Sequence, residues 1–159
     1  MKKTLLFITG LILGIILFMP KENLFFTAQH YLKNQNLFIN FQTINSSLFK
    51  LKLENVNIYY KGIDGVNIKQ INILPLLFIN KIYLKNINIF NNNANIEITY
   101  NIFSPFKMDI KGSSNFGEIK GDINLNKKHL KVYILNLKND KLKTFLKHNQ
   151  KGYFYEQSF

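Results

Sequence analysis

One eight-residue pattern occurs three times in the middle of this chain, and it restricts the fold more than any other feature. Each copy reads apolar–x–apolar, a charged residue, an amide, and then apolar–Asn–Ile, and the copies begin at Leu51, Val66 and Ile82. Self-similarity at a fixed period is the mark of a recurring supersecondary unit. At this short spacing the unit is a strand with its connection, because a pair of helices needs a longer period. The sequence therefore predicts a sheet of similar strands.

Within each copy, the apolar residues change from one face of the strand to the other. Positions one and three of the pattern share a face, whereas positions six and eight have the opposite parity. A β-bulge at the intervening pair, Glu54–Asn55 or Lys85–Asn86, would return all four side chains to one side and bend the strand. A corner between two packed layers is the other arrangement that fits. Both predict curved strands with one apolar face.

An uncharged run, Thr4–Met19, precedes the repeats and follows Lys2 and Lys3. As a helix it measures roughly 25 Å, slightly less than the ~30 Å hydrocarbon core of a bilayer. No A-x-A-like site follows it, which favours a retained membrane anchor over a cleaved signal peptide. The two lysines favour a short cytoplasmic tail and export of the rest of the chain. Residues 1–20 are thus the predicted anchor, with its membrane-facing residues at Leu5, Leu6, Gly10, Gly14, Ile15 and Phe18.

The remainder of the chain divides into a short helix and one β domain. Residues 21–35 are predicted to form an amphipathic helix that lies on the membrane surface or caps one end of the sheet. Residues 36–159 are predicted to form a single curved antiparallel meander of about eight or nine strands, with a helix at Asp140–His148 and a last strand at Tyr153–Phe159. The link Leu74–Ile79 is unusually apolar for a loop, which indicates burial or membrane contact. The expected fold class is mainly β, and the sheet is either an open groove or a sandwich.

The net charge of +12 does not favour a nucleic-acid partner. All 21 basic residues are lysine, whereas base and phosphate recognition prefers the planar guanidinium of arginine. AT-rich codons supply Lys, Asn, Ile and Phe, so part of the basic excess follows from base composition. The chain contains no cysteine, which removes a disulfide framework, a thiolate metal site and a lipoprotein anchor.

No motif in the sequence assembles catalytic chemistry. The three histidines, His30, His129 and His148, have no second ligand at metal-binding spacing and are expected to be solvated. Glu118 and Asp122 flank a lysine on one face of a strand, in a charge-balanced environment that does not push two carboxyl pKa values apart. A phosphate-binding glycine loop and a nucleophile elbow are both absent. We therefore expect no enzyme, no metal site and no cofactor.

The repeats and the apolar helix before them resemble a known group of envelope proteins. The segments concerned are Ser47–Ile58 (SLFKLKLENVNI), Gly65–Leu77 (GVNIKQINILPLL) and Ile82–Ile89 (IYLKNINI). Over residues 1–90 this hydrophobic rhythm is similar to that of AsmA-like proteins and of the compact type II secretion protein N. The resemblance implies an inner-membrane anchor and a periplasmic, curved antiparallel sheet with an apolar trough. It also implies a part in moving phospholipid between membranes, in which the larger members are implicated.

Two functions are consistent with these features. In the first, a bacterial inner-membrane protein with its bulk in the periplasm binds a lipid or another acyl chain in an apolar β groove, or assists lipid transport or envelope assembly. In the second, a single-pass structural subunit of a secretion or lipopolysaccharide-export complex has a closed β core and no ligand. The expected partners are the membrane, a phospholipid or other acyl ligand, and proteins of an envelope complex. The predicted groove residues are Leu51, Leu53, Val56, Ile58, Val66, Ile68, Ile71, Ile73, Ile82, Leu84, Ile87 and Ile89.

Overall fold

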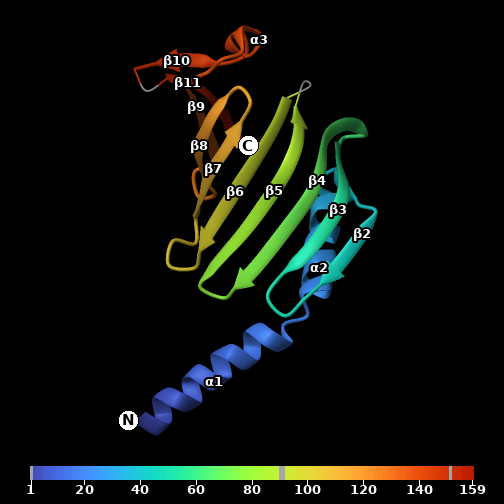
Figure 1. The fold of residues 1–159 in the computed structure, drawn as a ribbon, viewed down its shortest axis with the longest axis vertical. Coiled ribbons are helices and arrows are strands. Elements are labelled where there is room, and N and C mark those ends of the chain that lie inside the picture. Colours follow the sequence, from blue (N-terminus) through green and yellow to red (C-terminus); the bar gives the residue numbers. More distant parts are fainter. Residues whose placement is uncertain (1, 90–91, 151) are drawn as a thin grey trace.

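The structure of the protein is a computed structural model that describes residues 2–89, 92–150 and 152–159; the side chains of residues 64, 89, 140 and 141 lie outside this description. In the described residues, two N-terminal helices precede one open antiparallel sheet of eleven strands (Figure 1). The strands are β1 (Leu37–Asn40), β2 (Thr43–Ser46), β3 (Leu51–Tyr60), β4 (Ile63–Leu76), β5 (Ile79–Ile89), β6 (Asn92–Asn101), β7 (Lys107–Ser114), β8 (Gly117–Asn124), β9 (His129–Leu135), β10 (Lys147–Asn149) and β11 (Gly152–Ser158). Their order in the sheet is β1-β3-β4-β5-β6-β7-β8-β9-β11-β10, and β2 also pairs with β3. The predicted mainly β fold and antiparallel meander are therefore confirmed.

Helix α1 (Lys2–Phe18) projects beyond the end of the sheet (Figure 1). Its apolar side chains are exposed, with Leu6 at 79% and Phe18 at 87%. Helix α2 (Lys21–Asn34) follows after a bend of 63°. Within the described residues no single helix has both the length and the hydropathy to cross a membrane, whereas α1 and α2 together meet the requirement by length and composition.

Helix α2 packs against the sheet beside its first strands. The ring of Phe25 meets the edge of the Phe41 ring, with centroids 5.7 Å apart. The Gln29 side-chain amide donates a hydrogen bond of 2.5 Å to the Ile39 carbonyl oxygen of β1. Helix α2 therefore lies against the face of the sheet beside its first strands and does not cap one of its ends (Figure 1).

A line of irregular backbone crosses the sheet where each repeat changes parity. Asn55 of β3 and Asn86 of β5 have left-handed φ angles of 50° and 53°. Asparagine tolerates this region better than most residues, which explains the asparagine at this position of the first and third copies. Between them, the pairing of β4 with both neighbours passes from Ile68 to Gln70 and leaves Lys69 out of the register.

This line continues to both sides of the three repeats. At the edge, β1 and β2 form two halves of one strand, interrupted at Phe41–Gln42 opposite Asn55. Towards the centre, Lys85 and Asn86 of β5 face the single residue Asn95 of β6, whose side-chain oxygen accepts a hydrogen bond of 2.9 Å from the Asn86 N–H. The predicted bulge at Lys85–Asn86 is confirmed. In β3 the left-handed Asn55 changes the parity without shifting the register against β4.

Because of these irregular positions, the apolar side chains of the repeats reach one concave face. The buried cluster runs across this face from Leu53 of β3 to Ile119 of β8, whose strands are five positions apart in the sheet. The cluster consists of Leu53, Val56, Ile68, Ile71, Ile87, Ala94, Ile110, Phe116 and Ile119. The convex face is polar and carries cross-strand ion pairs, such as Lys81–Glu97 at 2.7 Å.

Two boundaries near turns differ from the sequence-based prediction. The helix expected at Asp140–His148 ends at Lys143 as α3 (Asp140–Lys143), because Lys147–Asn149 pairs with β11. The apolar link Leu74–Ile79 is mostly strand: β4 runs to Leu76, and a two-residue turn leads directly into β5. The described residues therefore contain more strands than the eight or nine expected, since the interrupted edge strand and β10 add to the count.

Candidate functional site

An apolar cavity of about 250 Å³ lies between α2 and the concave face of β3, β4 and β5. Leu51 is at the start of β3, and Ile82 is near the start of β5, so the cavity is at the end of the sheet from which α1 leaves. An engineered cavity of about 150 Å³ lined by such side chains stays dry and binds benzene. The cavity therefore has room for a segment of hydrocarbon. It is lined by Lys21, Leu24, Phe25, Ala28, Leu51, Ile73, Pro75 and Ile82.

Lys21 is the one charged residue in this lining, and it is 5% exposed. Its ammonium donates long hydrogen bonds to the Ile16 and Met19 carbonyl oxygens, at 3.3 and 3.4 Å. A cation suits the C-terminal end of a helix, where unpaired carbonyl groups carry negative partial charge. Lys21 therefore holds the bend between the two helices and places a positive charge beside the apolar cavity.

The structure divides the predicted groove residues into two groups. Three of them, Leu51, Ile73 and Ile82, line the cavity. The side chain of Ile89 lies outside the described residues. The others form or adjoin the buried cluster, which Ile73 and Ile82 also adjoin, so the protein's own side chains cover the concave face there: Leu53, Val56, Ile58, Val66, Ile68, Ile71, Leu84 and Ile87.

The helix wall of the cavity was not foreseen as part of the groove. The spacing of Leu24 and Ala28 predicts one apolar face on α2. Which strands this face would cover depends on the direction in which the chain turns after Pro20, and local sequence does not specify that direction.

The predicted anchor residues lie along α1 and contact little else in the described chain. The exposed fractions are 68% for Leu5 and 47% for Ile15. A Cβ built on Gly10 or Gly14 would meet no heavy atom within 4 Å apart from the helix's own backbone. In the described chain, no other helix therefore packs against Gly10 or Gly14.

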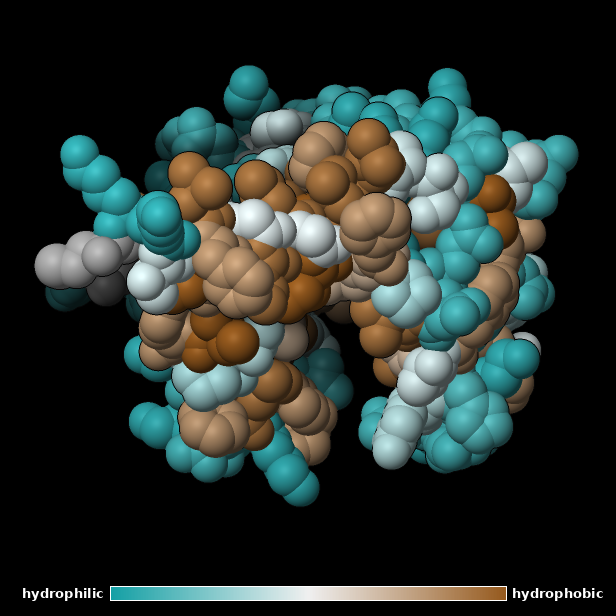
Figure 2. Space-filling view, turned by 90° about the horizontal axis from the view of Figure 1, so that it is seen from below, coloured by the Kyte–Doolittle hydropathy of each residue, from teal (hydrophilic) through white to brown (hydrophobic). Residues whose placement is uncertain are grey.

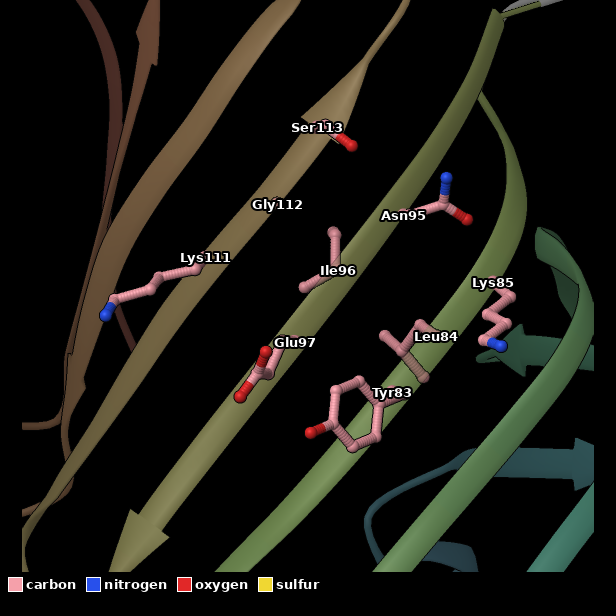
Figure 3. Close-up of a pocket in the computed structure, with 9 residues that line it drawn as sticks. All are labelled: Tyr83, Leu84, Lys85, Asn95, Ile96, Glu97, Lys111, Gly112 and Ser113. Atoms are coloured by element: carbon pink, nitrogen blue, oxygen red, sulfur yellow. The ribbon is translucent and has the colours of Figure 1, made fainter.

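A second depression, of about 480 Å³, crosses β5, β6 and β7 on the convex face (Figure 3). Gly112 forms part of its floor; a Cβ there would lie 2.4 Å from the Asn95 carbonyl oxygen. The Lys111 and Glu97 side chains point away from Lys85 and do not converge on a common point (Figure 3). The Glu97 carboxylate is also engaged by Lys81, which lowers its pKa from the ordinary 4.5. This arrangement is a shallow polar surface and does not assemble a catalytic pair.

His129 differs from the solvated histidine expected from the sequence. Its Nε2 lies 2.8 Å from the Glu156 carboxylate, which Lys131 also approaches at 3.3 Å. Hydrogen bonds from His129 and Lys131 hold the pKa of the Glu156 carboxyl below its ordinary value of 4.5.

In the described part of the chain, no group of three His, Cys, Asp or Glu residues is placed to hold a metal ion. The Glu118 carboxylate is 61% exposed and lies 3.9 Å from the Lys120 ammonium.

No protein-family model, curated protein or solved structure matches this chain. The protein is therefore classified by its own geometry. It is a curved, single-layer, open antiparallel sheet with two N-terminal helices and an apolar cavity at the end where they join it.

Proposed function

We propose that the protein is an inner-membrane-anchored periplasmic protein of the bacterial envelope that binds an acyl chain in the cavity beneath α2. The observation that carries this proposal is the composition of the cavity, which is hydrocarbon apart from one buried lysine at its wall. An apolar site with one polar group is typical of sites that hold a chain and orient its head. The resemblance to AsmA-like proteins, where a trough shields lipid, points to the same ligand class.

The proposed anchor is α1. Its large apolar side chains are exposed on all sides, and burying each in hydrocarbon gains roughly 1.5–3 kcal/mol. At about 25 Å the helix is short for a bilayer, and local thinning of the bilayer compensates such a mismatch at modest cost. Because the cavity lies at the α1 end of the sheet, an acyl chain leaving the bilayer has a short path into it.

A structural role without ligand is the second candidate. The buried cluster favours it, since nine buried apolar side chains on the concave face stabilise the fold without a ligand. In this reading the cavity beneath α2 is a packing defect of a subunit in an envelope complex.

Native mass spectrometry of the full-length protein in mild detergent tests the proposal. Ile82→Trp fills the cavity from β5, and Ile63→Trp makes the same change at a side chain that is 72% exposed at the other end of the sheet. We expect bound lipid or fatty acid on the wild type and on Ile63→Trp, and loss of it from Ile82→Trp. Far-UV circular dichroism verifies that both variants fold. Equal occupancy of all three proteins, or no lipid on any of them, contradicts acyl binding in this cavity.

A further inference from the structure

Exposed large apolar side chains gather on the connections at the α1 end of the sheet. They come from the β2–β3, β4–β5, β6–β7 and β8–β9 connections, which antiparallel pairing brings to one edge. Phe103 is the most exposed of them, at 78%. We refer to this set as the loop rim, and it consists of Leu48, Phe49, Phe78, Ile79, Ile102, Phe103, Phe106 and Leu125.

Contacts between the connections make much of the loop rim one continuous surface. The Phe78 and Phe103 rings stack with centroids 6.0 Å apart and planes 5° from parallel. The Leu125 N–H donates a hydrogen bond of 2.8 Å to the Phe106 carbonyl oxygen. These contacts join the β4–β5, β6–β7 and β8–β9 connections.

The charge of the loop rim has one sign. The four connections, residues 47–50, 77–78, 102–106 and 125–128, contain Lys50, Lys127 and Lys128 and no Asp or Glu. All three lysines are exposed. Aromatic side chains beside lysines are the combination that binds the interface of an anionic bilayer, where rings enter the headgroup layer and ammonium groups meet lipid phosphates.

The opposite end of the sheet has a different character. Its described connections include Asn115, Asn136 and Asn139, and the exposed large apolar residues near it include Tyr31, Tyr60, Ile63 and Phe145. Figure 2 looks at the α1 end, where hydrophobic side chains, including those of α1 in front, lie beside the hollow between the two sides of the arched sheet. Exposed large apolar side chains on the described connections are therefore more numerous at the α1 end of the sheet than at the opposite end.

We infer that the loop rim is a second membrane-contact surface, which docks the end of the sheet on an anionic lipid bilayer. This inference rests on the proposed function, since it takes the membrane that holds α1 as the partner. Docking places the cavity opening against the headgroup layer, so that an acyl chain passes from bilayer to cavity without crossing water. The bilayer is favoured over a protein partner because α1, the apolar rim and the lysines all lie at one end.

Single tryptophans test this inference, because the chain contains none. Full-length Phe103→Trp reports the loop rim, Ile63→Trp reports the opposite end, and Leu6→Trp reports α1. Each variant is reconstituted into vesicles of equal parts phosphatidylcholine and phosphatidylglycerol, with or without lipids brominated on their acyl chains. Bromine quenches tryptophan within contact distance of the hydrocarbon. We expect strong quenching of Leu6→Trp and Phe103→Trp and none of Ile63→Trp.

The other outcomes are distinct. Quenching of Leu6→Trp alone supports the anchor and overturns the docking surface. A blue-shifted, unquenched Phe103→Trp emission that depends on the number of protein molecules per vesicle means that the loop rim contacts a second copy of the protein. Quenching of no variant overturns the membrane proposal as a whole. Equal quenching of all three means that the domain lies flat on the bilayer, which also overturns docking by one end. Phe49→Trp on the β2–β3 connection repeats the test if Phe103→Trp does not fold.

The lysines provide an independent arm. The double substitution Lys127→Glu and Lys128→Glu is added to the Phe103→Trp protein and, separately, to the Leu6→Trp protein. It should reduce the quenching of the tryptophan at position 103 and leave the quenching of the tryptophan at position 6 unchanged. Each lysine near an anionic surface contributes roughly a fivefold change in affinity. Pure phosphatidylcholine vesicles should show the same reduction without any charge substitution. Quenching that is insensitive to both changes contradicts the electrostatic part of the inference.

Discussion

Replacing Asn86 by valine tests whether the left-handed amide is what bends the strands. The φ angle of Asn86 is 53°, a region that a β-branched side chain enters at a cost of roughly 1–2 kcal/mol. The Asn86 N–H donates to the Asn95 side chain, and this hydrogen bond does not involve the Asn86 side chain. We therefore expect Asn86→Val to destabilise the fold by about 1–2 kcal/mol, chiefly through backbone strain.

Asn88→Val is the matched control. Asn88 lies two residues further along the same strand, is also exposed, and pairs regularly with Asn67 of β4 and Asn93 of β6. Valine favours an extended strand there, so Asn88→Val should be neutral or slightly stabilising. Asn86→Gly completes the set, because glycine adopts a positive φ without strain and should recover most of the loss.

The measurement is urea or thermal unfolding of the full-length protein in detergent, followed by far-UV circular dichroism. For a chain of this length, 1 kcal/mol shifts the unfolding midpoint by about 2–4 °C, so Asn86→Val should melt about 2–8 °C below the wild type. Equal midpoints for Asn86→Val and Asn88→Val, or Asn86→Gly less stable than Asn86→Val, would refute the reasoning.

Three further outcomes follow from the described contacts. Leu53→Ala removes a side chain that is 0% exposed and should cost about 2–5 kcal/mol in urea unfolding, whereas Leu48→Ala, at a residue 62% exposed, should change stability by less than about 0.5 kcal/mol. The pKa of the Glu156 carboxyl is lowered in the folded protein, so this group stabilises the fold above the ordinary value of 4.5, and stability should fall as pH drops from that value through the lowered one. Glu156→Gln should make this decline in the unfolding midpoint shallower, and an unchanged pH profile would contradict the coupling. Lys21→Met should cost no more than about 1 kcal/mol in the same unfolding assay, because its hydrogen bonds are long at 3.3 and 3.4 Å, while Lys21→Glu should cost more by placing an anion at the C-terminal end of α1.

The arrangement of the repeats could be anticipated because it follows from the local chain. The apolar residues of each repeat alternate with a period of two and change parity within the copy, at Glu54–Asn55 in the first and at Lys85–Asn86 in the third. Few conformations bring all of them to one face, and the bulge in β5 is one of these conformations. The last strand, Tyr153–Phe159, was recognised from its alternation and is β11, ending at Ser158. The end of α3 was missed because the pairing of Lys147–Asn149 with β11 overrides helical spacing.

The sequence by itself determined the strands, the positions at which they bend and the apolar character of α1, because these depend on residue parity, on the φ preference of asparagine and on composition. Only the tertiary structure decided which of the apolar residues form a filled core and which border a cavity. Leu53 and Ile82 look alike in the repeat, yet Leu53 is fully buried within the cluster, whereas Ile82 is partly buried beside it and borders the cavity beneath α2. That distinction depends on how far the sheet curves and where α2 packs, and both are set by contacts between residues that are distant in sequence.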